Sequence, residues 1–108
     1  MQKPLLELRH LIAIVILSEE LNYTLAAIRL GMSQSGLSRL IQDAERRHDR
    51  KLFRRNHSKV ELTDAGRTCV AEAKLSIEHE ERAIQFARAL AHDVDSNLAV
   101  GHSTLTRY

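Results

Sequence analysis

The fold of this chain is decided by residues 21–45, LNYTLAAIRLGMSQSGLSRLIQDAE. They predict a short helix that is capped by Asn22 or Thr24 and ends near Leu30, followed by a turn at Gly31, where a positive φ costs little. A second helix would be capped by Ser33 and end near Arg47 or His48. A short helix, a tight turn and a second helix that opens with small polar residues are typical of a helix-turn-helix.

The two helices divide into an apolar and a polar set of side chains. The apolar positions that can share one core are Leu25, Ala26, Ile28, Leu30, Leu37, Leu40 and Ile41. The positions of the second helix expected to face solvent are Gln34, Ser35, Ser38, Arg39 and Gln42. Because a helix-turn-helix places its second helix in the major groove, these solvent-facing residues are candidates for contact with DNA.

The segments on either side complete a small domain. Residues 5–17 predict a buried helix, apolar nearly all round (Leu8, Leu11, Ile12, Val15, Ile16), and residues 19–22 predict a loop. Residues 51–62 predict a hairpin, with strands over residues 52–55 and 60–62 and a basic turn at residues 56–59. Such a wing would lie against the DNA backbone or in a minor groove, and the alternative is an ordinary surface hairpin.

Residues 64–92 predict one long helix, capped by Thr63 and with Asp64 in its first turn. One stripe of this helix alternates spacings of three and four residues, as in a coiled-coil seam, and only Glu80 interrupts it: Val70, Ala73, Ile77, Glu80, Ile84, Ala87, Ala91 and Val94. A second copy of the chain is the simplest partner for this stripe. The alternative is that the stripe packs back on the chain's own domain.

Length and composition predict one small folded domain with a helical appendage. The chain has 108 residues, of which 44% are hydrophobic, and it contains no apolar run near the ~18 residues of a membrane span. The N-terminal apolar segment is followed by Glu19 and Glu20 rather than by a cleavage site, so we expect no secretory signal. The single cysteine, Cys69, indicates a reducing cytoplasm, and we expect it to be a buried small hydrophobic residue.

Charge is distributed unevenly along the chain, although the net charge is only +2. Residues 39–67 carry nine bases and five acids, which gives +4, whereas residues 68–108 carry four bases and six acids, which gives −2. A basic segment directly after a helix-turn-helix is expected of a surface that contacts phosphates, although a solvated charged face is the alternative for any such cluster.

The residue patterns give no support to an enzyme. None of the six histidines (His10, His48, His57, His79, His92, His102) is spaced from a carboxylate or cysteine as metal ligands are, so we expect each to lie at the surface or in a loop. No glycine-rich phosphate loop and no nucleophile elbow are found. We therefore expect no catalysis, no metal and no cofactor.

In order and spacing, several motifs together resemble the N-terminal DNA-binding region of LysR-type transcriptional regulators over residues 5–101. The residues that carry the resemblance are Leu8 to Leu11, Tyr23 to Ala27, Leu30 to Arg39, Leu52 to Arg55, Leu62 to Gly66 and Leu98 to Gly101. The chain departs from the family pattern at Ser35 and Gly36, where Pro and Ala are usual, at Ala44, where Leu is frequent, and at His48 and Asp49, where an apolar residue and Gly are usual.

The resemblance implies a mainly α fold: a winged helix-turn-helix of three helices and a two-stranded wing over residues 1–63, and a long dimerisation helix over residues 64–93. Residues 94–108 would be a hinge and the truncated start of an effector domain that is missing here. The implied DNA-binding residues are Thr24, Ser33, Gln34, Ser35, Ser38, Arg39, Gln42, Arg54, Arg55, His57 and Lys59. The implied dimerisation residues are Val70, Ala73, Ile77, Ile84, Ala87 and Ala91.

These expectations describe a cytoplasmic regulator that binds dyad-symmetric double-stranded DNA as a homodimer, without a membrane or a small-molecule effector site in this chain. Gln34 has the amide geometry for a bidentate contact with adenine, and the backbone amides near Thr24 and Ser33 suit phosphate. The alternative is a protein-interaction module, or a truncated remnant, that pairs through its long helix with a full-length regulator.

Overall fold

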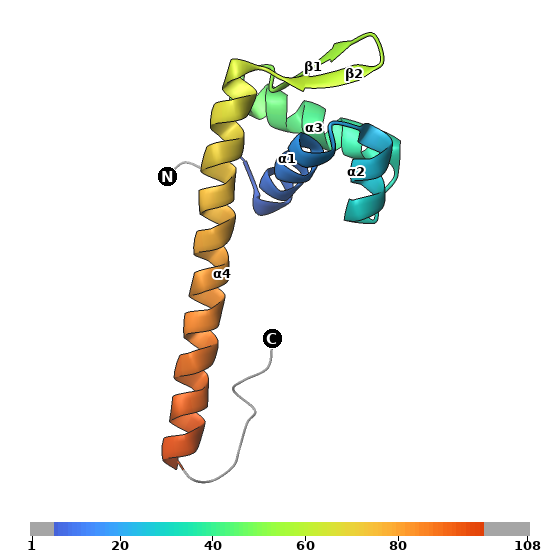
Figure 1. Cartoon of the computed structure of the whole chain (residues 1–108). Helices are drawn as coiled ribbons and strands as arrows, with labels where there is room; N and C mark the ends of the chain where they lie inside the picture. The colour runs from blue at the N-terminus through green and yellow to red at the C-terminus, as the bar shows by residue number, and fades with distance from the viewer. Residues whose placement is uncertain (1–5, 99–108) are drawn as a thin grey trace. The chain divides into compact units, whose positions relative to one another are not determined.

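The computed structural model describes residues 6–98, and these residues form five elements of the expected winged helix-turn-helix and the long helix that follows it (Figure 1). The helices are α1 (Leu8–Glu20), α2 (Tyr23–Leu30), α3 (Gln34–His48) and α4 (Asp64–Leu98). Strands β1 (Phe53–Asn56) and β2 (Lys59–Leu62) form one antiparallel hairpin. The mainly helical fold class predicted from the sequence is confirmed.

Helix α1 ends later than the sequence predicts. Glu19 and Glu20, expected in a loop, are helical, and only Leu21 leaves the helix, with a φ of 50°. The Leu21 N–H still donates to the Leu17 carbonyl at 2.7 Å, so the chain turns out of α1 through a left-handed residue. Asn22 then caps α2, because its Oδ1 accepts a hydrogen bond from the Leu25 N–H at 2.9 Å.

The turn between α2 and α3 is the one that the sequence predicts. Gly31 has a φ of 67°, a conformation that costs glycine little. The Ser33 hydroxyl accepts from the Gly36 N–H at 2.9 Å and caps α3. Helix α3 ends at His48, and Asp49 takes the left-handed conformation with a φ of 57°.

The core lies between α1, α2, α3 and the base of the hairpin. Helix α3 contributes Leu37, Ile41 and Ala44, which are buried at helical spacing. On α2 the buried pair is Ala26 and Ala27, with Tyr23 and Leu30 packed against the core. These four positions follow the spacing i, i+3, i+4, i+7 of one helix face.

Two residues predicted in this core are not in it. Leu25 is 48% exposed and Ile28 is 70% exposed, because both lie outside the stripe of α2 that faces α1 and α3. Leu8, expected in a helix buried on several sides, is 40% exposed at the first turn of α1. Leu30 and Leu40 are half-buried against the core, and Cys69 is buried, as expected.

The hairpin is joined closely to the start of α4. Its register pairs Phe53 with Leu62 and Asn56 with Lys59. The Thr63 hydroxyl accepts from the Gly66 N–H at 2.9 Å, which caps α4, and also donates to the Lys51 carbonyl at 2.5 Å. A Cβ on Gly66 would lie 2.1 Å from the Leu52 carbonyl oxygen, so only glycine allows this approach of helix and strand.

Helix α4 continues through residues 93–97, where the sequence predicts a polar break. Helical hydrogen bonding tolerates the polar side chains there, since none of them is Pro or Gly. Leu98 is the last helical residue rather than the start of a strand, and the rest of that expected strand, residues 99–101, lies outside the described residues, as does the remainder of the tail.

The chain divides into two compact units at residues 77 and 78, so the first part of α4 belongs with the helix-turn-helix and the hairpin. In this first unit Val70 is 9% exposed and Ala73 is 1% exposed, because both are covered by the chain's own domain. Ile77 is partly buried. In the second unit every residue from 78 to 90 is exposed, including Ile84 and Ala87, and Ala91 is partly buried.

Candidate nucleic-acid interface

The starts of α2 and α3 meet at one surface. The Thr24 hydroxyl on α2 donates to the Gln34 Oε1 on α3 at 3.1 Å, and both side chains are exposed. Ser33 and Ser35 flank Gln34 and are also exposed. Two helix N-termini, in each of which the capping side chain binds one first-turn N–H group, therefore lie beside a side-chain amide, and such a surface suits phosphate and base edges.

Two clefts connect this surface with the hairpin. The first, of about 250 Å³, is lined by residues of the α2 start, the α3 start and the hairpin turn: Asn22, Tyr23, Thr24, Gln34, Arg55, His57, Ser58 and Val60. The second, of about 260 Å³, runs along α3 under the hairpin and is lined by Tyr23, Ser38, Gln42, Glu45, Lys51, Phe53, Arg54, Arg55 and Val60. Seven of the eleven predicted DNA-binding residues therefore line these two neighbouring clefts.

Arg55 and Tyr23 join the two clefts. The Arg55 guanidinium carbon lies 4.6 Å from the centre of the Tyr23 ring, which is cation–π geometry. Burial raises the pKa of the Tyr23 hydroxyl, the Glu45 carboxylate raises it further, and Arg55 opposes both. The neutral ring therefore serves as a platform that holds the guanidinium at the edge of the surface.

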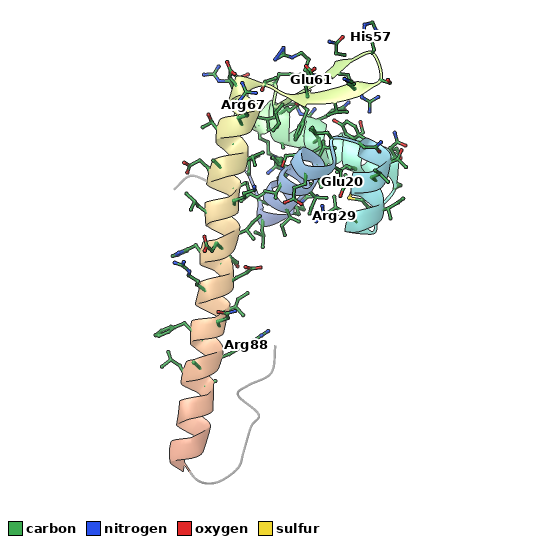
Figure 2. All side chains as sticks on the ribbon, viewed as in Figure 1. Glu20, Arg29, His57, Glu61, Arg67 and Arg88 are labelled. Atoms are coloured by element: carbon green, nitrogen blue, oxygen red, sulfur yellow. The ribbon has the colours of Figure 1, made fainter. Side chains whose placement is uncertain are left out.

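The hairpin carries the other basic residues of the surface. Arg54, His57 and Lys59 are exposed, and Figure 2 shows His57 at the turn between β1 and β2, the end of the hairpin farthest from α4. His57 has a φ of 61° and lies in the two-residue turn. The buried Phe53 and Val60 hold the hairpin on the core, so the exposed basic side chains project from a fixed support.

Arg39 does not lie with the other predicted residues. It lines a separate depression of about 490 Å³ beside α1, together with Arg9, Arg46 and Arg47. Within that group Arg9 pairs with Glu7 at 2.9 Å, and both Arg46 and Arg47 pair with Asp43. Arg39 is exposed on the flank of α3, away from both clefts.

Sequence reasoning missed the residue that anchors the hairpin to α3. The Glu45 carboxylate accepts from the backbone N–H groups of Leu52 and Phe53 at 2.9 Å and 3.0 Å. Its side chain is only 12% exposed. Glu45 is seven and eight residues from Leu52 and Phe53 in the sequence, and no helix or strand periodicity connects them. Only the folded loop brings the two N–H groups to the carboxylate.

His10 corrects a second expectation, since it is fully buried and not at the surface. Its Nδ1 accepts from the Glu7 N–H at 3.0 Å, and its Nε2 lies 2.8 Å from the Asp43 Oδ2. Both ring nitrogens therefore have partners, which makes burial of this polar side chain tolerable. Its position among the apolar residues of α1 was the available signal, because that helix is buried on several sides.

Comparison with known proteins gives this geometry its context. The family model described as bacterial regulatory helix-turn-helix protein, lysR family, matches residues 8–67, which is more than half of the chain. The chain belongs to the LysR family. The match covers α1 to the first turn of α4, and so includes both helix starts and the hairpin that form the clefts.

Two relatives of the chain illustrate the extent of the match. The transcriptional regulator ShiR of Corynebacterium glutamicum (strain R) is 36% identical over 103 residues, which are 95% of this chain and 35% of ShiR. The regulator BudR of Klebsiella aerogenes is 36% identical over 96 residues, which are 89% of this chain and 67% of BudR. The chain spans about a third of the length of most curated relatives that it matches.

Solved structures of LysR-family members share the fold. A complex of the CbnR DNA-binding domain with DNA matches with a TM-score of 0.76 and 32% identity, over 80% of this chain and 99% of that domain. A complex of the BenM DNA-binding domain with benA site 1 DNA matches with a TM-score of 0.76 and 29% identity, over 79% of this chain and 99% of that domain. Between residues 6 and 98, no helix is long and apolar enough to cross a membrane.

Proposed function

We propose that this LysR-family chain is a sequence-specific regulator of transcription that binds a dyad-symmetric site on double-stranded DNA as a homodimer in the cytoplasm. The observation that carries the proposal is the convergence of the α2 start, α3 and the basic hairpin on two neighbouring clefts. The similarity to the two DNA-binding domains in complex with DNA supports the proposal. Neither an enzymatic activity nor a cofactor is part of it.

Different residues of the interface would contact base edges and phosphates. Gln34, Ser35, Ser38 and Gln42 would face the major groove, with the Gln34 amide suited to adenine. Arg54, Arg55, His57 and Lys59 would contact phosphates or the minor groove, and the exposed N-termini at Thr24 and Ser33 would contact phosphate through backbone N–H groups. Arg39 would contact a phosphate outside the clefts.

The second unit would supply the dimer contact. Residues 78–90 form an exposed stretch of helix with no core of its own, and the exposed large apolar side chains include Ile84, Phe86 and Leu90. A helix of this kind gains most of its stability from packing against a partner. Because Val70 and Ala73 are covered within one chain, Ile77, Ile84, Ala87 and Ala91 remain as the predicted dimer contacts; the side chain of Val94 is outside the described set.

Variants on α4 test the dimer separately from DNA. Ile84→Glu should shift sedimentation equilibrium toward monomer, because it places a charge in the proposed apolar contact. Glu80→Leu should shift the equilibrium toward dimer, because it fills the one charged position of the stripe. If neither substitution changes the association constant, the predicted stripe is not the dimer contact.

Binding to duplex DNA over a range of salt concentrations tests the function itself. A homodimer whose affinity falls steeply with salt is the expected result, since the contacts to phosphate release counterions. A monomer that ignores DNA but binds a full-length LysR-type regulator through α4 would instead support the interaction module. The exposed Leu25 and Ile28 on α2 are an observation that favours a protein contact, so both measurements should be made on the same preparation.

A further inference from the structure

A partly buried hydrogen bond connects α1 with α3, the proposed recognition helix. His10 of α1 is fully buried, and its Nε2 lies 2.8 Å from the Oδ2 of Asp43 on α3. The other ring nitrogen, Nδ1, accepts the Glu7 N–H at 3.0 Å. Because Nδ1 accepts, the neutral ring carries its proton on Nε2 and donates it to Asp43.

The Asp43 carboxylate is also held by two neighbours on its own helix. Arg46 Nη2 lies 3.2 Å from Oδ1, and Arg47 Nε lies 3.1 Å from Oδ2. Arg47 reaches back to α1, where its Nη1 lies 3.3 Å from Glu7 Oε2. Asp43 therefore has a single defined position, with three donors directed at it.

The bond lies on the opposite side of α3 from Gln34, whose amide is the proposed contact with adenine. Gln34 and Asp43 are nine residues apart, about two and a half helical turns, so their side chains leave α3 on opposite faces. The apolar contacts of Leu37 and Ile41 keep one face of α3 buried, but such contacts are not directional. A hydrogen bond is directional, so the bond to His10 restricts rotation of α3 about its axis.

A small rotation of α3 is enough to disturb base recognition. A side-chain atom about 6 Å from the helix axis moves about 1 Å when the helix turns by about 10°. A shift of this size takes an amide out of the ~2.7–3.2 Å range of a hydrogen bond to a base edge. Contacts to phosphate tolerate such a shift better, because they depend more on charge than on direction.

We infer that the His10–Asp43 hydrogen bond is a positioning contact that sets the rotation of the recognition helix and thereby the sequence specificity of DNA binding. The inference rests on the proposed function. It assigns the role to two residues that do not touch DNA, and it predicts an effect on specificity that a general loss of stability would not produce.

The test compares Asp43→Ala with Asp43→Asn. The readout is the affinity for a duplex selected from a random pool divided by the affinity for a scrambled duplex of the same length. Both affinities are measured at the same salt concentration. The Asn side chain keeps an oxygen that accepts from His10, whereas Ala removes the acceptor. We expect Asp43→Ala to lower the ratio about 10-fold, the equivalent of one base contact, and Asp43→Asn to keep it within about twofold.

Two substitutions of His10 test the other side of the bond. Gln places an amide donor near the position of the imidazole Nε2 and can still reach Asp43, whereas Asn places its amide near Nδ1 and cannot. His10→Gln should therefore keep the ratio and His10→Asn should lower it. Glu78→Ala, on the exposed second part of α4, is the control for loss of one negative charge and should leave the ratio unchanged.

The ratio separates positioning from mere stability. A variant that is only less folded loses affinity for both duplexes by the same factor, because the fraction of competent protein falls. Equal losses on both duplexes for Asp43→Ala and His10→Asn would overturn the inference and leave the proposed function standing. If the unmodified chain, well folded, selects no duplex, the proposed function fails and this inference fails with it.

Discussion

Gln34 and Arg55 differ in what they can contribute to DNA recognition, although both line the same cleft. The Gln34 amide offers a donor and an acceptor in one plane, which suits a base edge. Arg55 offers a charge held over Tyr23, which suits a phosphate. Gln34→Ala should relax the base preference at one position by about 1–3 kcal/mol.

Arg55→Ala should instead weaken binding to all sequences alike and reduce the slope of log K against log salt by about 1. Both variants are measured by fluorescence anisotropy on a panel of single-base operator variants at several salt concentrations. If Gln34→Ala also weakens all duplexes equally, Gln34 does not contact a base.

Substitution of Glu45 should lower stability more than is usual for a partly exposed side chain. Its carboxylate is the acceptor for the N–H groups of Leu52 and Phe53, and both of those residues are buried. Glu45→Ala should lower the free energy of unfolding by about 1–3 kcal/mol, because buried donors lose their partner. Glu45→Gln keeps an acceptor oxygen and should cost less.

Urea unfolding measures the effect of the Glu45 substitutions. Glu61→Ala, on the exposed face of β2, removes an acid without removing an acceptor of the loop and is the matched control. A Glu45→Ala variant as stable as the Glu61→Ala variant would show that water replaces the carboxylate at the two N–H groups.

The C-terminus of α3 is an element end that a substitution should improve. Asp49 has a φ of 57°, which is costly for a residue with a Cβ, and its charge lies at the negative end of the helix dipole. Asp49→Gly should raise the free energy of unfolding by about 1 kcal/mol. Asp49→Ala removes the charge but keeps the strained φ, so its free energy of unfolding should rise by less. Thermal unfolding of both variants measures the difference. A loss of stability in Asp49→Gly would mean that the Asp side chain has a favourable contact.

Element boundaries were predictable wherever a capping residue marks them. Ser33, Gly31 and Thr63 each signal an end through chemistry that acts within four residues, and the structure has those ends in place. The end of α1 was not predictable in this way, because Leu21 is an unusual residue for a left-handed position.

The faces of the helices were less predictable than their ends. In α2, eight residues are too few to show which apolar side chains are buried: the sequence placed Leu25 and Ile28 in the core together with Ala26, and the structure buries only Ala26 of these three. In α4, one periodicity fits both a partner helix and the chain's own domain. Val70 and Ala73 pack against the chain's own domain. The sequence alone could not show at which residue of α4 this packing ends.

Contacts between residues far apart in the sequence are the other features of the structure that could not be predicted. The His10–Asp43 bond joins residues 33 positions apart, and nothing in the local pattern of either helix indicates it. The candidate DNA-binding residues, in contrast, were predictable as a group because the family motifs fix their order. Their division into two clefts, with Arg39 outside both, follows only from the packing of the hairpin on α3.

At the scale of the whole molecule, stability should depend on pH through Asp43. The hydrogen bond from His10, followed by the charge of Arg47 and the hydrogen bond from Arg46, holds the pKa of this carboxyl below its ordinary value, although partial burial opposes the shift. A carboxyl with a lowered pKa in the folded state stabilises the fold above its ordinary pKa, and this contribution is lost as the pH falls through the folded value.

The difference in unfolding free energy between the unmodified chain and Asp43→Asn should therefore be constant near neutral pH and shrink below about pH 4. Urea unfolding of both proteins from pH 7 to pH 3 measures it. A difference that stays constant over the whole range would contradict the lowered pKa of Asp43.

The distribution of charge over the molecule agrees with the proposed use of each part. The segment that holds α3, the hairpin and the start of α4 has a net charge of +4, and the part that follows has −2. A positive segment attracts DNA.

Selection of bound duplexes from a random pool by the purified chain, at moderate salt, is the most direct measurement of sequence-specific DNA binding by a homodimer. We expect enrichment of an inverted repeat with one fixed spacing between half-sites, because two recognition helices related by a dyad would each contact one half-site. Failure of the folded protein to enrich any sequence would contradict the claim that this chain is a sequence-specific DNA-binding regulator.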